Sequence, residues 1–418
     1  MANTLLKRLR ENDKKGLFKP TQTSVSYRTG FLPLDYRNGY MVQVRDLNDK
    51  LIQEYPSIGI VGGTNITIIG KSGTAKTTFA CQMAANIVKP FKDNAFVIHY
   101  DLEQALTYTR IKNITKLSHA ELDDKYILKQ EKNYIEDIFD SIMKIANLKE
   151  AERDNFTYET NLKDEFNRPI RAFVPTIIII DSIPTLASID SVKTVGRGDN
   201  KVETMEMEGG TYSNRVAKAL SQFYKRLMPI IKTYNITVIA VNHINHKIEI
   251  NPMVHTQAQL NYLGKDESIP GGNAPLYFAH NLFKFISRDK YKEEEDGFDG
   301  FDIDCLLIKS RTNKAGQSCK LVYNQVSGFD PILTQLKFAI NNNLIDGRNP
   351  YRFIKGFNDI KFDTRKFNKE FIKNEKLRTA LFKSTIPILE KQLSRINPED
   401  DYKLNNDNYL EILKLSVS

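Results

Sequence analysis

The chain has 418 residues, of which 41% are hydrophobic and 27% charged, so it can bury a sizeable core and disorder is not its default state. The formal charge is +9, which favours an anionic partner, with nucleic acid first. Cys81, Cys305 and Cys319 form no CxxC pair, and no apolar run is long enough to span a bilayer. We therefore expect no disulfide framework, zinc site or membrane span, and a cytoplasmic location.

The N-terminal part begins with a predicted short basic helix over residues 2–15, which either docks onto another surface or is a solvated tail. Residues 26–39 are an apolar segment punctuated by Gly30, Pro33 and Gly39. Residues 40–58 are interpreted as an insertion before the first strand of the core.

A phosphate-binding loop is the strongest signal in the chain. Residues 66–69 are a β-branched run typical of a buried parallel strand, and apolar residues recur at helical spacing from residue 79 to 87. A glycine-rich turn between strand and helix directs backbone N–H groups and the positive end of the helix dipole at an anion. We predict that ATP phosphates bind here, on Gly70, Lys71, Ser72, Gly73, Thr74, Ala75, Lys76, Thr77 and Thr78.

Lys76 and Thr77 stand where the loop meets the helix. The ammonium group would reach the β- and γ-phosphates, and the threonine hydroxyl would hold Mg²⁺. The pattern G-x-x-x-x-G-K-[ST] has glycine before the lysine, whereas this chain has Ala75. Either Gly73 supplies the flexibility, or the loop keeps a φ angle that alanine tolerates. The alternative interpretation is an ordinary strand–turn–helix with a surface lysine.

Acidic residues follow two further predicted strands. The β-rich run at residues 95–100 leads to Asp101 and Glu103, and the run at residues 176–180 leads to Asp181. In open α/β sheets the chemistry collects at the carboxyl ends of the strands. Glu103 is therefore placed to orient or deprotonate a water that attacks the γ-phosphate, although it could be a solvated loop acid. Asp181 matches a Walker B aspartate that holds Mg²⁺ beside Thr77.

Two long loops accompany the later strands. Residues 188–211 form a polar, glycine-containing loop, and a helix is predicted to follow it. The strand at residues 235–241 ends in Asn242 and His243, a polar pair that can sense the γ-phosphate. Residues 244–272 form the second loop, and loops of this length inside a compact domain are usually functional or disordered.

The remaining chain contains a helix that begins near residue 273 and strands at residues 282–286 and 303–308, with an acidic hairpin turn between them. Residues 149–172 are interpreted as an excursion without recognisable chemistry. From about residue 329, phenylalanines alternate with Lys and Arg, which suggests a small C-terminal domain. These rings either form a core beneath a basic surface or stack on bases.

Taken in their order along the chain, these motifs resemble those of the RecA-type strand-exchange recombinases, and they look most like those of the phage UvsX-like branch. The matching segments are residues 29–39, 70–78, 101–106, 181–182, 242–243, 270–279 and 309–311. The resemblance implies an α/β fold with a RecA-like P-loop ATPase core at residues 59–330, whose mostly parallel central sheet is flanked by helices. It also implies an N-terminal polymerisation segment at residues 1–58, which adds a strand to the adjacent subunit, and a small α+β domain at residues 331–418.

The resemblance further implies an ATP- and Mg²⁺-dependent ATPase that self-associates into a helical filament on single-stranded DNA and pairs it with homologous duplex DNA. Single-strand-binding and mediator or loader proteins are further implied partners. Glu103 and Lys76 would act in hydrolysis, His243 would sense the γ-phosphate, Lys309 and Arg311 would reach the neighbour's ATP, and Tyr108 would stack on adenine. DNA contacts are expected from Lys193, Arg197, Lys201, Lys247, Lys265, Gly271, Gly272 and Asn273.

Two other functions stay open at this point. A hexameric replicative helicase shares the core fold, but it normally carries an extra domain before the ATPase, whereas here the extra domain follows. A nucleotide-binding regulatory or scaffold protein would use ATP only to assemble. Strand separation on forked DNA would favour the first, and ATP turnover that ignores single-stranded DNA would favour the second.

Overall fold

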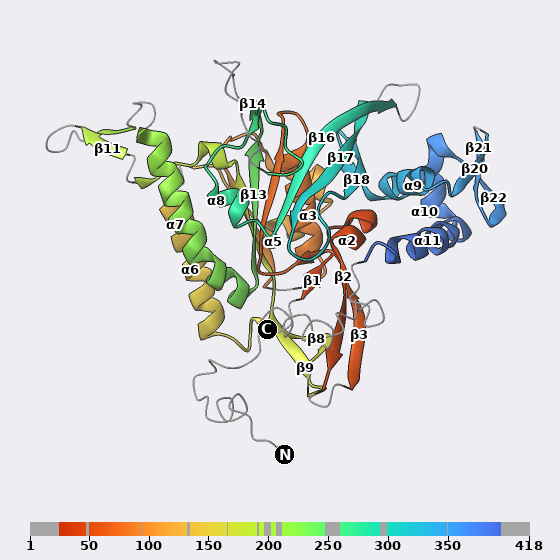
Figure 1. Cartoon of the computed structure of the whole chain (residues 1–418), viewed down its shortest axis with the longest axis horizontal. Coiled ribbons are helices and arrows are strands. Elements are labelled where there is room, and N and C mark those ends of the chain that lie inside the picture. Colours follow the sequence, from red (N-terminus) through yellow and green to blue (C-terminus); the bar gives the residue numbers. More distant parts are fainter. Residues whose placement is uncertain are drawn as a thin grey trace, which may run out of the picture.

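A nine-stranded sheet forms the centre of the computed structural model (Figure 1). The structure describes residues 25–46, 50–92, 94–131, 134–164, 166–189, 192–195, 202–205, 211–246, 260–292, 299–348 and 350–393. In sheet order, the strands are β19 (Gly328–Asp330), β18 (Ser318–Asn324), β17 (Asp299–Ser310), β16 (Asn281–Lys292), β5 (Asn65–Gly70), β13 (Ile236–His243), β10 (Thr176–Asp181), β6 (Phe96–Asp101) and β7 (Tyr126–Lys129).

The six strands from β16 to β7 run parallel, and β17, β18 and β19 extend the sheet in antiparallel fashion. Strands β5 and β10 are buried along their whole length, as expected of β-branched runs that are covered on both faces. The register places Asp101 opposite Asp181, and His243 opposite Gly70. The carboxyl ends of these strands therefore meet at one edge of the sheet.

Helices cover both faces of the sheet (Figure 1). Helix α3 (Lys76–Val88) packs on one face, in a core that contains Ile177 and Ile179. Helices α6 (Ile135–Ala151) and α7 (Thr211–Tyr234) pack on the other, in a core that contains Ile178 and Ile180. Successive isoleucines of β10 thus alternate between two cores, because strand side chains point to opposite faces. The predicted α/β class, with a mostly parallel sheet flanked by helices, is confirmed.

Residues 26–38 fold back onto their own chain. Strand β1 (Ser26–Tyr27) pairs with β4 (Ile60–Val61), and helix α2 (Leu32–Asn38) follows, with a proline in its first turn. Phe31 and Leu34 are buried in the core beneath α3. Pairing with β4 and apolar burial hold residues 26–38 within the chain. The expectation that this segment adds a strand to an adjacent subunit stays a prediction. Residues 2–15 lie outside the described part of the chain.

The predicted insertion at residues 40–58 and the predicted excursion at residues 149–172 each contribute a β-hairpin. The two hairpins lie together at the end of the sheet opposite the phosphate loop (Figure 1). One contains β2 (Tyr40–Arg45) and β3 (Leu51–Ser57), and the other β8 (Thr157–Lys163) and β9 (Pro169–Phe173). The Gln53 side chain donates to the Asn161 oxygen at 3.0 Å and accepts from the Lys163 N–H at 2.9 Å. The ring of Tyr158 packs edge-on against Phe91. The hairpins therefore form one lobe.

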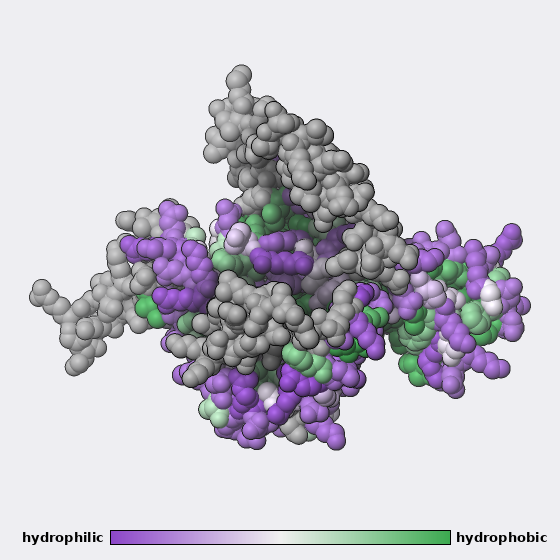
Figure 2. All heavy atoms as spheres, turned by 60° about the horizontal axis from the view of Figure 1, so that its bottom comes forward, coloured by the Kyte–Doolittle hydropathy of each residue, from purple (hydrophilic) through white to green (hydrophobic). Residues whose placement is uncertain are grey.

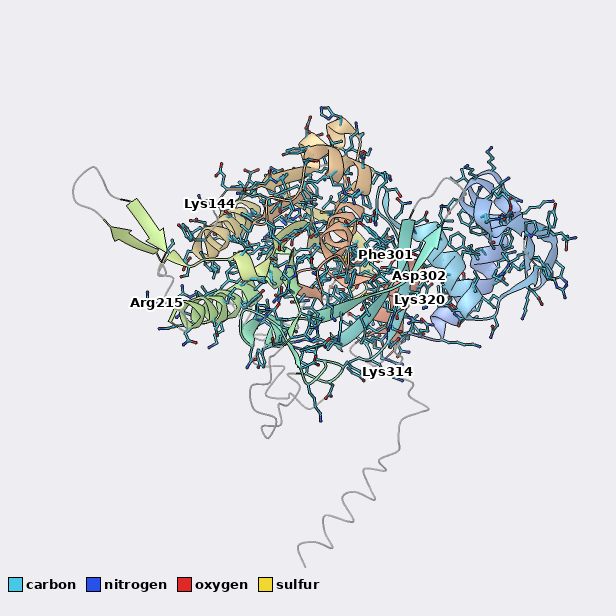
Figure 3. All side chains as sticks on the ribbon, turned by 90° about the horizontal axis from the view of Figure 1, so that it is seen from above. Lys144, Arg215, Phe301, Asp302, Lys314 and Lys320 are labelled. Atoms are coloured by element: carbon cyan, nitrogen blue, oxygen red, sulfur yellow. The ribbon has the colours of Figure 1, made fainter. Side chains whose placement is uncertain are left out.

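The C-terminal residues build a separate hydrophobic core. A three-stranded sheet of β20 (Ile345–Arg348), β21 (Tyr351–Ile354) and β22 (Phe357–Asp363) joins α9 (Pro331–Asn341), α10 (Phe367–Lys373) and α11 (Glu375–Glu390). Phe362, Phe367 and Phe371 are buried in this core, so these rings are packing residues. Apolar and hydrophilic patches alternate on the surface of this lobe (Figure 2). Lys337 of α9 pairs with Asp302 of β17 at 2.7 Å. Asp302 lies where the main sheet meets this lobe (Figure 3).

Shorter elements connect these layers. They are α4 (Tyr108–Thr115), α5 (His119–Lys125), η1 (Ile183–Thr185), β11 (Val192–Val195), β12 (Val202–Met205), β14 (Asn245–His246), β15 (Glu267–Ser268), α8 (Ala274–Tyr277) and η3 (Thr364–Lys366). The predicted acidic turn lies outside the described residues, although β16 and β17 on either side of it are paired. All three cysteines are buried free thiols. Within the described ranges, no helix has the length and apolar character needed to cross a bilayer.

Candidate ATPase site

The phosphate loop joins the end of β5 to the start of α3. Gly73 has a φ of +77°, and Ala75 lies in the left-handed region at φ 56° and ψ 28°. Gly73 therefore turns the chain, as the first sequence alternative expects, whereas Ala75 does not keep a φ that alanine tolerates well but adopts a backbone that favours glycine. The Lys76 ammonium donates to the backbone oxygen of Lys71 at 2.8 Å. Burial lowers the pKa of Lys76, against the opposing charges of Asp181 and Glu103.

Thr77 and Asp181 meet at the base of the loop. The Thr77 hydroxyl donates to Oδ2 of Asp181 at 2.6 Å, and Asp181 is almost fully buried at the end of β10. A hydroxyl and a carboxylate are oxygen ligands of the kind Mg²⁺ takes while it keeps waters and nucleotide phosphates. The residues present therefore fit Mg²⁺.

A buried histidine that sequence analysis missed lies behind Asp181. Nε2 of His99 is 3.8 Å from Oδ2 of Asp181, and Nδ1 is 2.8 Å from the Tyr126 hydroxyl. Burial by itself lowers the pKa of His99, but the neighbouring Cys81 and Asp181 outweigh it and raise this pKa to about 10. The only sequence signal was a polar residue inside an apolar strand, which points to no particular partner.

The two acids after β6 have different environments. Asp101 is buried and turned into its own loop, where its carboxylate accepts from the Leu106 N–H at 2.9 Å and the Gln130 amide at 2.8 Å. Glu103 faces the phosphate loop instead. Its Oε1 accepts from the Ser182 hydroxyl at 2.6 Å and lies 3.0 Å from Nε2 of His243.

The charge of Glu103 follows from these partners. Partial burial raises its pKa, but the hydrogen bonds from Ser182 and His243 and the charge of Lys76 bring it below the usual value. Glu103 is therefore a carboxylate at neutral pH, as a group that accepts a proton from water must be.

His243 is connected to the second long loop through its neighbour Asn242. The buried Asn242 side chain accepts from the His243 N–H at 2.8 Å and donates to the Pro270 oxygen at 2.9 Å. Gly271 and Gly272 follow with φ angles of +88° and +74°. A Cβ on Gly271 would lie 2.9 Å from Cγ2 of Ile183, so this end of the loop packs directly against the segment after Asp181.

A protein-family model described as "ATPase: KaiC" matches residues 47–199. The matched range contains the phosphate loop, Glu103 and Asp181. No curated protein matches the chain. The parallel sheet, the phosphate loop at the end of β5 and the acidic residues at the ends of β6 and β10 agree with this match. The chain carries a RecA-like P-loop ATPase domain.

Within the RecA-like ATPase domain, Lys309 and Arg311 lie far from the other candidate catalytic residues. Lys309 of β17 pairs with Leu282 of β16, which pairs in turn with Thr67 of β5. Thr67 precedes Gly70 by three residues, which places Lys309 about 10 Å back along the strands from the phosphate loop. Arg311 follows the end of β17, still further from the loop.

Both cations gather at the exposed Tyr277 at the end of α8. Lys309 donates to the backbone oxygens of Leu276 at 2.9 Å and Tyr277 at 2.6 Å, and Arg311 donates to that of Tyr277 at 3.3 Å. Partial burial and the charge of Arg311 lower the pKa of Lys309.

The other expected ligand-binding residues of the RecA-like ATPase domain are dispersed. Tyr108 begins α4 and is 49% exposed, and Lys265 is exposed just before β15. Asn273 directly precedes α8. Lys193 lies in strand β11. Three further residues lie outside the described part of the chain, namely Arg197, Lys201 and Lys247.

Proposed function

We propose that this protein is an ATP-dependent DNA recombinase of the UvsX-like type. Its subunits polymerise head to tail on single-stranded DNA and catalyse pairing and strand exchange with homologous duplex DNA. This activity serves recombination, repair and recombination-dependent replication, in the cytoplasm of a host cell if the protein is phage-encoded. Single-strand-binding and mediator or loader proteins are its proposed partners.

The separation of Lys309 and Arg311 from the phosphate loop carries the proposal. Hydrolysis of a triphosphate needs cations that neutralise the charge developing on the γ-phosphate. Within one subunit, these two cations lie about 10 Å or more from the loop along the strand direction. In a head-to-tail assembly, the same cations of one subunit can face the nucleotide of the next, because such interfaces join two different surfaces.

A chain of contacts supports coupling between ATP and DNA. Glu103 contacts His243, and Asn242 ties the His243 backbone to Pro270. A γ-phosphate that attracts the His243 imidazole would compete with Glu103 for it. Movement of His243 would then be transmitted through Asn242 to the segment that contains Gly271 and Gly272, which we propose to contact DNA.

The charge of helix α7 supports a nucleic-acid partner. This helix is the next element of the chain after the β11–β12 hairpin, and Arg215 lies at that end of it (Figure 3). It has no acidic residue, and its basic residues are Arg215, Lys218, Lys225, Arg226 and Lys232. Lysine and arginine side chains bind DNA phosphates without reading bases. The affinity for DNA should therefore fall steeply with salt, and base pairing between the two DNAs should test their sequence identity.

Each residue of the site has a proposed task. Lys76 and the loop N–H groups bind the phosphates, Glu103 accepts a proton from the attacking water, and Lys309 and Arg311 neutralise charge from the neighbouring subunit. Tyr108 stacks on adenine. Thr77 and Asp181 would hold Mg²⁺, which neutralises phosphate charge when bound. ATP thus stabilises the filament on DNA, and hydrolysis weakens it.

Mixing two inactive variants tests the shared site. Lys76→Ala subunits keep the cations but lose the phosphate loop, and subunits with Lys309→Ala and Arg311→Ala keep the loop but lose the cations. If the site is shared, random mixing on single-stranded DNA restores about one interface in four, and ATP turnover returns. A mixture as inactive as its components would contradict a shared site.

Electron microscopy with ATP and single-stranded DNA tests the assembly itself. The proposal expects helical filaments, together with strand exchange between a circular single strand and a homologous linear duplex. Closed rings that unwind forked DNA and exchange no strands would instead indicate a helicase.

The range of the family match favours a second candidate, an ATPase that uses nucleotide only to assemble. Residues 47–199 include the nucleotide-binding residues but end before α7, His243 and Lys309. ATP turnover that is unchanged by single-stranded DNA would support this second candidate.

A further inference from the structure

We propose that Ser182 is a positioning residue for Glu103, and that the two partners of this glutamate have different roles. Ser182 holds the carboxylate throughout the cycle, whereas His243 holds it only until the γ-phosphate attracts the imidazole. The inference rests on the proposed role of Glu103 as the group that accepts a proton from water.

The two contacts converge on one oxygen atom. The Ser182 hydroxyl and Nε2 of His243 both bind Oε1 of Glu103, at 2.6 Å and 3.0 Å. Oε2 of the same carboxylate is therefore left to accept from an attacking water. A carboxylate fixed through one oxygen keeps a defined direction for the other, and defined direction is the main requirement for general-base catalysis.

The segment that carries Ser182 is fixed to the segment that carries Glu103. The Leu102 N–H donates to the Asp181 backbone oxygen at 2.7 Å, so the chains that precede the two partners are joined directly. Ser182 itself has no exposed surface, and its backbone oxygen accepts from the Thr185 hydroxyl at 2.7 Å. Ser182 therefore has no freedom to leave Glu103 without breaking the end of β10.

His243 is placed to exchange partners. Its side chain is 30% exposed and stands at the end of β13, opposite Gly70 at the start of the phosphate loop. An anion on that loop would attract the imidazole N–H more strongly than a single carboxylate oxygen that is already bonded to Ser182. The geometry thus assigns the permanent contact to Ser182 and the exchangeable contact to His243.

Ser182→Ala tests this assignment. We expect kcat for DNA-stimulated hydrolysis to fall about 10- to 100-fold, with KM for ATP unchanged, because the hydroxyl orients the base without contacting nucleotide. In a Glu103→Gln background, where no base remains to be oriented, Ser182→Ala should cause no further loss. An equal further loss in that background would show that Ser182 acts elsewhere and would overturn the inference.

The chain offers a matched control six residues further on. The buried Ser188 hydroxyl donates to Oε1 of Glu136 at 2.6 Å, which is the same kind of bond away from the phosphate loop. Ser188→Ala should therefore leave kcat unchanged. If Ser182→Ala does not fold, Ser182→Cys retains the side-chain volume with only a weak donor and should give an intermediate fall in kcat. Full activity of the folded cysteine variant would also overturn the inference.

Failure of the inference can be separated from failure of the proposed function. If Glu103→Gln hydrolyses ATP normally, the proposed role of Glu103 is wrong and Ser182 has no base to orient. If Glu103→Gln is inactive while Ser182→Ala retains full kcat, only the role of Ser182 is wrong.

Discussion

The ammonium group of Lys76 donates to the backbone oxygen of Lys71, 2.8 Å away across the same phosphate loop. Lys76 is 6% exposed, so the cation is bound to its own loop rather than directed into solvent. Triphosphate binding must therefore exchange this carbonyl contact for contacts to phosphate oxygens, which are stronger because both partners are charged.

Lys76→Ala should abolish hydrolysis, with a loss of at least about 100-fold in kcat/KM, because one cation on the transferring phosphate is removed. A steady-state assay with saturating single-stranded DNA measures the effect. Lys89→Ala, at the other end of the same helix, is the control and should retain activity. Near-normal turnover by Lys76→Ala would mean that the loop does not bind the γ-phosphate.

Ala75→Gly should stabilise the protein. A left-handed alanine costs about 1–2 kcal/mol, and the greater freedom of glycine in the unfolded chain offsets about half of that gain. We expect the free energy of unfolding in urea to rise by roughly 0.5–1 kcal/mol. The complementary change Gly73→Ala introduces the same strain at φ +77° with no steric clash, and should lower stability by about 1 kcal/mol. Equal stabilities for both variants would contradict this assignment of strain.

Asp35→Asn should alter the pH dependence of stability. Burial raises the pKa of Asp35 to about 6, although hydrogen bonds from Thr29 and the charge of Arg28 oppose this shift. Because the folded state binds this proton more tightly than the unfolded state, the contribution is complete below about pH 4 and is lost as the pH rises through about 6. Above that range the carboxylate costs at most about 3 kcal/mol.

The amide oxygen of an asparagine can accept the same two bonds from Thr29, without a charge. The variant should therefore lose the fall in stability between pH 4 and 6 and be the more stable protein at pH 7.5. Urea unfolding at pH 4.5, 5.5 and 7.5 gives the comparison. An unchanged slope would show that Asp35 keeps its ordinary pKa.

Asn242→Ala should uncouple ATP turnover from DNA. The change breaks the link from the His243 backbone to Pro270, so we expect stimulation by single-stranded DNA to fall several-fold while basal hydrolysis persists. It also leaves two buried groups unpaired, at a cost of about 1–3 kcal/mol in stability. Asn281→Ala removes a similarly buried asparagine at the opposite end of the sheet, from β16, which is separated from β13 by β5, and should lower stability without reducing stimulation.

Much of the core could be predicted from local patterns. The isoleucine run before Asp181 has to be buried on both faces, and an acid or a glycine-rich loop at a strand end marks the edge where chemistry collects. Phe362 and Phe367 were ambiguous between packing and base stacking, and burial decides for packing.

Other features depend on contacts between distant parts of the chain. The roles of Ser182 and His99 follow from where β6, β7 and β10 lie beside each other, which a linear sequence does not specify. Strands β2, β3 and β8 of the two hairpins consist mostly of half-buried and exposed residues, so they show little of the buried–exposed alternation that marks a strand. The expectation that residues 26–38 pair with another subunit came from the family resemblance alone. Their pairing with β4 within the chain was not predicted, because β4 is only two residues long.

The phosphate loop is attached to a strand that is buried along its whole length. Strand β5 lies between β16 and β13, and all six of its residues are buried. Its amide hydrogens can exchange with solvent only when both neighbouring strands separate, which amounts to opening the domain as a whole. Deuterium uptake by the backbone amides of residues 66–69 would therefore measure the population of unfolded protein directly. Binding and release of nucleotide would change only the loops at the carboxyl ends of the strands.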